Sequence, residues 1–556
     1  MERRVLLAIS LSFLVLFLYQ SYFAPPPAAP VETSTGGSAA GAAIPTPPPG
    51  GSPVTPSPDP APPPVKVDEG ESSEREITVE TRNVRAVFTN RGGRLKHWVL
   101  KQYRNEGGEP LDLIPAAEAV NNALVPFSLR LDDQDATSAA NGGLYQSDAT
   151  GTIDASAQPA TITFAWRGGG LAVRKIFTLQ PDGYIIAFTA TVQRNGQALN
   201  PTIEWGPGLG DENAHASTGS FLAPSYSTPA QALLHRDRSV VRLAPSAPGS
   251  EEGPFLFAGI DDHYFAALAL NDTANPQPMR FDHTSFVVPP KSEGAPPGRY
   301  AAFAVRHAAS PNGQRFFFGP KAFDTLRAVD TELVRVINFG IFSWLAVPLL
   351  GALKWVHQYV GNWGWAIILL TVLINLAMFP LRQKAVTSMR KMQEIQPEMK
   401  AIQERYAKYK VTDPQRQKMN EEVMALYKAK GVNPASGCVP MLLTFPFLFA
   451  FYAMLSQAIE IRGADFFGWI TDLSRPDPLY ITPLLMGATM FWQQKITPTS
   501  ADPVQQRVMM IMPVMFTVMF LAYPSGLVIY WTISNLWAIG QQYLTTSLVA
   551  PVKSKS

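Results

Sequence analysis

The C-terminal part of the chain contains long segments without charged side chains, and this feature most restricts the folds open to the sequence. Val508–Val552 has no Asp, Glu, Lys or Arg, and the residues between Lys354 and Arg382 have none either. A helix of about 20 apolar residues crosses a hydrocarbon layer of about 30 Å. The sequence therefore predicts a membrane helical bundle. The candidate spans are Gly364–Leu381, Cys438–Ile459, Leu479–Gln494, Val508–Tyr523 and Gly526–Leu544.

The N-terminus predicts a further span. Val5–Phe23 is a mostly apolar run that follows Arg3 and Arg4. A cleavable signal peptide is the competing interpretation, but prolines follow Ala24 and make a poor cleavage site. We expect residues 1–23 to be an uncleaved transmembrane anchor with a cytoplasmic N-terminus. Residues 24–75 read as a disordered linker, because they are rich in proline and almost free of large apolar residues.

Residues 76–319 have the pattern of an all-β domain. Apolar and polar residues alternate in short runs such as Thr161–Trp166, Leu171–Leu179 and Tyr184–Val192, with glycine-rich or Pro-Asp-Gly turns between them. Several short strands separated by such turns indicate a large antiparallel sandwich.

Positive charge predicts the orientation of the spans. Arg382–Lys430 contains 12 Lys and Arg against 6 Asp and Glu, and loops with such an excess stay in the cytoplasm. Counting Phe339–Lys354 as a span would put this loop outside, so we interpret residues 320–359 as an amphipathic region in the outer interface. Six spans result, with both termini cytoplasmic and the β domain outside. Residues 360–548 hold five of these spans, and residues 549–556 form a short cytoplasmic tail.

The cytoplasmic loop 382–430 predicts a helical hairpin. Apolar residues recur every three or four positions from Met389 to Tyr406, and Pro397 predicts a bend. Asp413 has the character of an N-cap, with Pro414 at the first helical position of a second helix. The basic residues of this hairpin include Arg390, Lys391, Lys400, Arg405, Lys408 and Lys418.

Patterns for catalysis or metal binding are weak. Cys438 is the only cysteine, the seven histidines are scattered, and the HExxH, GxSxG and P-loop motifs do not occur. The spans lack Asp, Glu and His, which argues against an intramembrane protease. We interpret Asp261-Asp262-His263 as a turn at a strand edge rather than a site, and Gly206-x-Gly208-x-Gly210 as a loop. No catalytic residue, metal site or cofactor is predicted.

Polar residues within the spans carry more information, because they are costly in hydrocarbon and tend to face a polar interior. Asn375 lies well inside its span, and Thr371 is one turn away on the same face. An interhelical hydrogen bond and a water-filled cavity are both open interpretations of Asn375. The other polar residues considered are Ser456, Gln457, Gln493, Gln494, Ser534, Asn535, Gln541 and Gln542.

Two spans are short, and methionine is concentrated near them. Leu479–Trp492 and Val508–Tyr523 reach about 21–24 Å at 1.5 Å per residue, less than a bilayer core of about 30 Å. Local thinning of the bilayer accommodates such segments. Of the 17 methionines, 15 lie at or after Met378. Methionine adapts to irregular apolar partners, although ordinary core packing explains these residues equally well.

A series of short motifs, most of them in the C-terminal part of the chain, resembles those of the YidC/Oxa/Alb family of membrane protein insertases. The resemblance is to its Gram-negative members in particular. The match covers about Phe317–Leu544 and, in the β domain, Val84–Tyr103 and Tyr264–Leu268. Its most specific motifs are Gly361-Asn362-Trp363-Gly364-Trp365, Met378-Phe379-Pro380-Leu381, Val432-Asn433-Pro434, Asp502-Pro503-x-Gln505-Gln506 and Tyr523-Pro524-Ser525-Gly526-Leu527.

The resemblance implies an inner-membrane protein with a core of five helices, an additional N-terminal anchor and a periplasmic β-supersandwich. It also implies a hydrophilic groove, open to the cytoplasm and the lipid, beside which nascent membrane segments slide. The implied partners are nascent membrane proteins, Sec translocon components, lipid, and the ribosome or targeting machinery at the basic hairpin, without recognition of a nucleic-acid sequence. By position, the groove and slide comprise Thr371, Asn375, Phe445, Pro446, Met519, Tyr523 and Tyr530.

One position departs from the family pattern. The family usually has a single basic residue where this chain has Asn375, so the spans are expected to lack a cation. The expected function is a non-enzymatic membrane protein insertase and chaperone. A membrane-anchored periplasmic assembly chaperone remains an alternative. A solute transporter is disfavoured, since the spans show neither internal repeats nor paired charges.

Overall fold

The computed structural model describes residues 67–105, 107–114, 125–206, 208–209, 230–243, 248–288, 298–307, 313–409, 413–431, 439–497 and 503–548. The chain divides into one unit of Met1–Asp68 and a second of Glu69–Ser556. The expected anchor 1–23, residues 24–66 of the linker, Cys438 and the tail 549–556 lie outside the described residues. Apart from Val67 and Asp68, every described residue belongs to the second unit.

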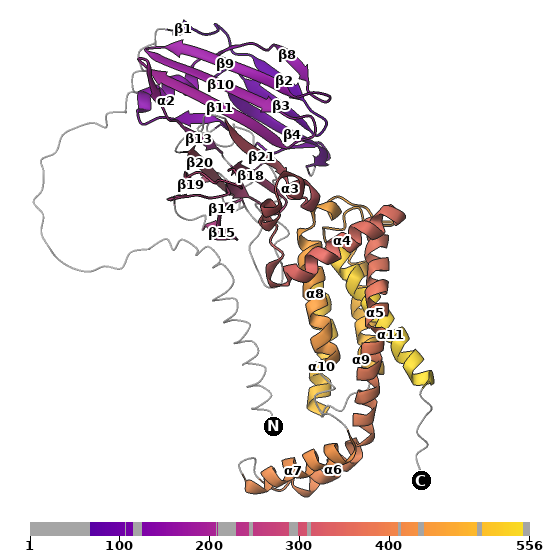
Figure 1. Cartoon of the computed structure of the whole chain (residues 1–556). Helices are drawn as coiled ribbons and strands as arrows, with labels where there is room; N and C mark the ends of the chain where they lie inside the picture. The colour runs from indigo at the N-terminus through magenta and orange to yellow at the C-terminus, as the bar shows by residue number, and fades with distance from the viewer. Residues whose placement is uncertain are drawn as a thin grey trace, which may run out of the picture. The chain divides into compact units, whose positions relative to one another are not determined.

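The β domain is built from short strands, as the alternating pattern predicts (Figure 1). One helix, α2 (Gln134–Gly142), lies among them. The strands are β1 (Val67–Glu69), β2 (Glu76–Glu80), β3 (Val84–Thr89), β4 (Arg94–Arg104), β5 (Pro110–Asp112), β6 (Ser128–Arg130), β7 (Gln146–Ser147), β8 (Gly151–Asp154), β9 (Ala160–Gly168), β10 (Leu171–Leu179), β11 (Ile185–Arg194), β12 (Gln197–Leu199), β13 (Thr202–Trp205), β14 (Gln231–Arg236), β15 (Ser239–Leu243), β16 (Gly249–Gly253), β17 (Phe257–Asp261), β18 (Phe265–Leu270), β19 (Met279–Val288), β20 (Gly298–His307) and β21 (Gln314–Pro320).

The described strands form three sheets. The largest runs β9-β10-β11-β21-β18-β17-β14-β15, and the two smaller ones run β16-β19-β20-β13-β6 and β5-β4-β3-β2-β8. Phe177 of the large sheet lies 4.9 Å from Phe88 of β3, and Phe318 lies 3.9 Å from Trp205 of β13, measured between ring centroids. Both smaller sheets therefore pack against the large one. The described strands pair antiparallel, as expected, except at one edge, where β2 pairs with β8 in parallel.

The C-terminal part is helical, and helices occupy all five segments expected to span the membrane (Figure 1). α11 packs against α5 and α9, α10 packs against α9, and α4 packs against α5 and α8. The elements are α3 (Phe323–Val329), η3 (Thr331–Val336), η4 (Gly340–Phe342), α4 (Ser343–Val360), α5 (Trp363–Glu394), α6 (Gln396–Arg405), α7 (Pro414–Ala429), α8 (Val439–Gln457), η6 (Ile459–Ile461), α9 (Ile481–Ile496), α10 (Pro503–Phe520) and α11 (Ser525–Leu548).

The hairpin differs from the expectation at its first helix. α5 continues as one 32-residue helix through Pro380 to Glu394, so its C-terminal end includes the start of the expected loop. The chain breaks before Pro397, which lies in the first turn of α6, where its missing N–H costs no intrahelical bond. α7 begins as predicted: Asp413 is its N-cap, accepts from the Gln415 N–H, and is followed by Pro414. Met392, Ile395 and Tyr427 pack together within the hairpin.

Candidate functional site

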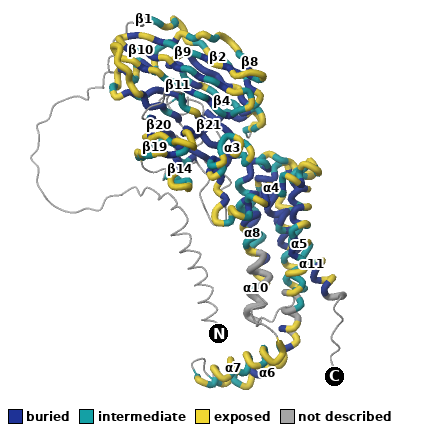
Figure 2. Tube along the Cα trace, in the orientation of Figure 1, coloured by how far each residue is buried: buried dark blue, intermediate teal, exposed yellow. Residues whose placement is uncertain are grey.

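Buried polar side chains gather among α5, α9 and α11, in the most apolar part of the sequence. Buried stretches of the helices, near α4 and in α11, are dark blue in Figure 2. We call these polar side chains the polar interior. All of its members have less than a tenth of their surface exposed, although their neighbours along the helices are apolar. Buried polar groups are stable only when they are hydrogen-bonded. The polar interior comprises Thr371 and Asn375 of α5, Thr489 of α9, and Thr532, Asn535, Gln541, Gln542 and Thr545 of α11.

Asn375 is 3% exposed and bonds within its own helix. Its Nδ2 donates to the Thr371 carbonyl at 2.7 Å, and Nη1 of Arg382 donates to its Oδ1 at 2.6 Å. The interhelical bond considered for Asn375 is thus not among its described contacts. Arg382 lies just beyond the expected span Gly364–Leu381, and its guanidinium reaches back to Asn375.

Hydrogen bonds of the polar interior also connect helices. Gln541 Nε2 donates to the Phe379 carbonyl at 3.4 Å, and Thr545 Oγ1 donates to Gln383 Oε1 at 2.7 Å, so α11 is bonded to α5. Asn535 Nδ2 donates to Thr489 Oγ1 at 3.3 Å and so connects α11 with α9. These bonds fix the rotation of three helices relative to one another.

The expected slide residues lie on three elements. Phe445, 39% exposed, and Pro446 lie in α8, and Met519 lies near the end of α10. Tyr523 follows α10 and is partly buried, with its ring 6.0 Å from that of Tyr452 in α8.

Tyr530, like Thr371 and Asn375, is a buried member of the expected groove residues. It lies in α11, and its ring stacks on Phe451 of α8 at 4.1 Å. Aromatic pairs thus connect α8 with α11 and with the end of α10. Phe451 and Tyr452 were not predicted from the sequence. Arg382 was expected near the cytoplasmic mouth of the groove rather than beside Asn375. Its spacing of seven residues from Asn375, which is two helical turns, is the signal that places the two on one helix face.

The loop between α8 and α9 covers the N-terminal end of α11. Leu473 accepts from the Gly526 N–H at 3.0 Å, and Arg475 accepts from the Ser525 N–H at 2.7 Å. The first N–H groups of a helix have no partner within it, so these loop carbonyls cap α11. Within the loop, Trp469 Nε1 donates to Asp477 at 2.9 Å.

The basic residues of the hairpin differ in their surroundings. Arg405 pairs with Glu422 at 3.0 Å, and Lys408 lies over the Tyr409 ring. Lys391, Lys400 and Lys418 are exposed. The side chain of Arg390 lies outside the described residues.

Asp261 ends β17, and Asp262 and His263 lie in the turn to β18, in agreement with the prediction of a turn at a strand edge. Asp262 accepts from the Tyr264 and Phe265 N–H groups, and Asp261 pairs with Lys321 at 2.9 Å and with Arg242 at 2.8 Å. His263 is buried, and its Nε2 lies 2.5 Å from the Ser456 carbonyl at the end of α8. Burial, together with Lys321, lowers the pKa of His263 to about 4, so its imidazole is neutral.

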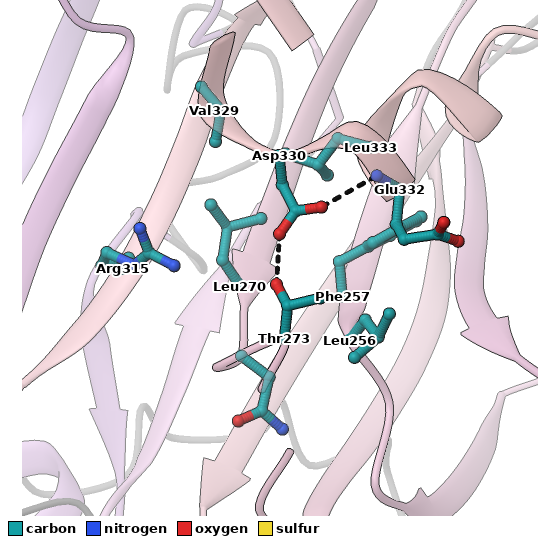
Figure 3. Close-up of a pocket in the computed structure, with 10 residues that line it drawn as sticks. Leu256, Phe257, Leu270, Thr273, Arg315, Val329, Asp330, Glu332 and Leu333 are labelled. Carbon is teal, nitrogen blue, oxygen red and sulfur yellow. Dashed lines mark hydrogen bonds between the residues drawn. The ribbon is translucent and has the colours of Figure 1, made fainter. Parts of the chain in front are cut away.

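A small cavity lies beside η3 in the β domain (Figure 3). Leu256, Phe257, Leu270 and Leu333 form much of its lining. Its central acid, Asp330, accepts from Thr273 Oγ1 and from the Glu332 N–H, and so serves as the N-cap of η3. The polar groups around this cavity thus bond to one another and stabilise its wall. Among the described residues, no group of three or more His, Cys, Asp or Glu is placed to hold a metal ion.

Comparison with known proteins decides the family. The family model for the YidC periplasmic domain matches residues 76–352, and the model for the 60Kd inner membrane protein matches residues 355–551. A "Membrane protein insertase YidC" of Syntrophus aciditrophicus is 35% identical, over 98% of this chain and 99% of that protein. One of Pelobacter propionicus is 34% identical, over 99% and 100%. The chain belongs to the YidC membrane protein insertase family.

Membership in the YidC family confirms the resemblance seen in the sequence. It gives the chain a β-rich periplasmic domain and a helical C-terminal part in a family of inner membrane proteins. These relatives are named as insertases, which agrees with the expectation of a non-enzymatic protein. A solved structure titled "Active YidC insertase crystal structure with the first transmembrane domain resolved" is 19% identical, with a TM-score of 0.35, over 87% of this chain and 94% of that one.

Proposed function

We propose that this chain inserts nascent membrane proteins into the inner membrane and helps them fold, through the polar interior among α5, α9 and α11. The observation that carries the proposal is a hydrogen-bonded set of buried Thr, Asn and Gln residues inside an otherwise apolar helical bundle of a YidC family member. A substrate hairpin would place its polar tail against these groups and its apolar segment against the slide residues Phe445, Pro446, Met519 and Tyr523.

The physical basis of this activity is solvation rather than bond chemistry. An unpaired polar group costs several kcal/mol in hydrocarbon, on the order of 2–7 per amide or hydroxyl. Polar side chains within the bundle shorten the apolar distance that a substrate tail must cross. α9 and α10 have 16 and 18 residues, or about 24–27 Å at 1.5 Å per residue, less than a bilayer core of about 30 Å. Thinned lipid beside them lowers the remaining barrier.

The proposed topology has six spans, with both termini in the cytoplasm, the β domain outside and α4 in the outer interface. By length and apolarity, Gly340–Val360 and Trp363–Lys384 both qualify as spans. Lys354, however, pairs with Asp324 of α3 and with Glu460 of the loop after α8, at 2.9 and 2.6 Å.

Further support for an interfacial α4 comes from its aromatic residues. Trp344, Trp355 and Tyr359 of α4 are exposed, and Trp and Tyr are enriched at membrane interfaces. A spanning α4 would also invert the basic hairpin to the outside, against the positive-inside rule.

The proposed partners follow from the surfaces of the chain. The apolar exposed faces of α9 and α10 suit lipid and entering membrane segments. The exposed Lys391, Lys400 and Lys418 of the hairpin suit the ribosome or targeting machinery. We propose that the chain acts either alone or together with the Sec translocon.

Depletion of the chain from living cells tests the proposal. We expect insertion of small, phage-coat-like proteins to fall several-fold, as measured by protease protection, and to return when the intact chain is supplied again. Normal insertion without the chain would contradict an insertase function.

A deletion separates the proposal from its alternative. Removal of Glu76–Gly319 should leave insertion of these small substrates largely intact if the helical bundle carries the activity. Lost insertion, with the shortened chain present in the membrane at normal amounts, would move the activity to the β domain and favour a periplasmic assembly chaperone.

A further inference from the structure

Arg382 and Asn375 lie on one face of α5. Seven residues separate them, which at 100° per residue is about 20° short of two full turns and about 10.5 Å along the axis. Side chains in a helix lean toward its N-terminus, so the long side chain of Arg382 runs back along this face. Its Nη1 reaches Oδ1 of Asn375 at 2.6 Å. The charge therefore lies deeper in the bundle than the sequence position of Arg382 indicates.

Asn375 is held in the orientation that accepts this bond. Its Nδ2 donates to the Thr371 carbonyl at 2.7 Å, and Thr371 Oγ1 donates to the Ile367 carbonyl at 2.6 Å. Because its amide nitrogen is engaged along the helix, the amide oxygen of Asn375 faces Arg382. Both Thr371 and Asn375 are buried, so the amide has little freedom to turn away.

Side chains of α11 bond to α5 close to Arg382. Tyr530 of α11 lies near enough to Arg382 for the two side chains to interact electrostatically. Gln541 bonds to the Phe379 carbonyl, and Thr545 bonds to Gln383, so α5 is tied to α11 on both sides of Arg382 along the chain. The direction of the Arg382 side chain is thus set by both helices.

We propose that Arg382 is a specificity-determining residue of the polar interior and that Asn375 is its positioning residue. In this pair, the amide of Asn375 holds the guanidinium inside the cytoplasmic end of the bundle, where it binds the carboxylates of an acidic tail on an entering membrane segment. A guanidinium has five N–H donors in a planar fork that matches a carboxylate, and it stays charged at all physiological pH values. The proposal rests on the insertase function proposed above.

The test compares two substrates in cells depleted of the intact chain. One is a small single-span protein with an acidic tail, and the other is the same protein with Asn and Gln in place of the tail acids. Arg382→Gln in the full chain should lower insertion of the acidic-tailed substrate about tenfold, the effect of one charge-assisted hydrogen bond. Insertion of the uncharged-tailed substrate should change less than about twofold, which also shows that the variant folds.

Variants of Asn375 test the positioning role. Asn375→Asp has the same shape and still accepts from Arg382, but it cancels the charge, so it should behave like Arg382→Gln toward both substrates. Asn375→Ala leaves the charge but removes the acceptor, and should give an intermediate loss that is larger for the acidic-tailed than for the uncharged-tailed substrate. The double variant Asn375→Arg with Arg382→Gln places a guanidinium directly at position 375 and should restore the acidic-tailed substrate.

Three results would overturn the proposal. The Arg382→Gln variant could insert both substrates as well as the intact chain does, or it could lose insertion of both substrates equally. The third result is that Asn375→Asp leaves insertion of the acidic-tailed substrate unchanged. A failure of the proposed function has a different signature, because the intact chain itself would then restore neither substrate.

Discussion

At the scale of single residues, Lys175 is the most unusual side chain of the β domain. It is fully buried at the centre of β10, where its Nζ donates to the carbonyls of Gly92 and Phe127 at 2.7 and 2.8 Å. Both of these residues have left-handed backbone, with φ of 73° and 66°. Burial holds the pKa of Lys175 well below its usual range. Lys175 thus bonds to two turns with left-handed backbone, a conformation that glycine adopts readily but that is unfavourable for Phe127.

Lys175→Met should destabilise the β domain by about 2–5 kcal/mol, because two buried carbonyls lose their donor at about 1–3 kcal/mol each. Thermal unfolding of the purified full chain, followed by circular dichroism of the strands, measures the loss. Arg174→Met is the matched control, since Arg174 is the exposed neighbour on the same strand and should change stability by less than about 0.5 kcal/mol. Equal stability of the two variants would show that the hydrogen bonds of Lys175 do not stabilise the β domain.

The bonding partners of single side chains, such as Lys175 and Arg382, could not be predicted from the sequence. The alternation of β10 places position 175 on the same face as Val173 and Phe177, but no pattern indicates which distant carbonyls a buried lysine will meet. Likewise, the spacing of Thr371 and Asn375 correctly indicates a shared helix face. The contact of Arg382 with Asn375 depends on side-chain reach and direction, so a count of charges within span boundaries misses it.

At the scale of elements, the contact between the β17–β18 turn and α8 depends on pH, because it includes the imidazole of His263. His263 bonds to the Ser456 carbonyl in the last turn of α8, where carbonyls lack intrahelical partners. The guanidinium of Arg462 lies over the rings of Tyr264 and Phe265, at 5.3 and 4.9 Å. Burial first, then Lys321 and Arg462, lowers the pKa of His263 to about 4, with Asp261 acting in the opposite direction.

This shift predicts a loss of stability in acid. The pKa of His263 is about 4 in the folded chain and about 6.5 in the unfolded one, so the unfolded state binds more protons between these values. Stability should be constant above about pH 7 and fall below pH 6.5 by about 1.4 kcal/mol per pH unit from this group, until pH 4. His263→Gln keeps an N–H donor without a titrating group. Unfolding measured from pH 7 to pH 4 should therefore be less steep in this variant, and identical pH profiles would contradict the role of His263.

Element boundaries were the least predictable feature of the helical part. The sequence has prolines at 380 and 397, and only the second coincides with a break between helices. Pro380 lies inside α5 and lacks the N–H that would bond to the Leu376 carbonyl. The helix nevertheless continues through it, and α11 packs along this helix. Tertiary contacts of this kind override a local helix-breaking residue, and a single sequence does not reveal them.

At the scale of the whole molecule, the sequence predicted most of the architecture because its parts differ strongly in composition. Charge-free helices, alternating strands and a basic hairpin are each recognisable from local patterns, and ordered motifs identified the family. The arrangement of the polar interior was harder to predict, since its bonds connect residues far apart in the chain, such as Asn535 with Thr489.

Crosslinking to a stalled nascent chain tests the central claim most directly. A photoreactive side chain is placed at Phe445, Met519 or Asn375, and at Tyr359 as the control, because Tyr359 is 75% exposed but lies on α4. If substrates enter along the polar interior and the slide residues, a nascent membrane segment should crosslink to the first three positions and not to Tyr359. Equal labelling of Tyr359, or no labelling of the other three positions while insertion proceeds, would contradict it.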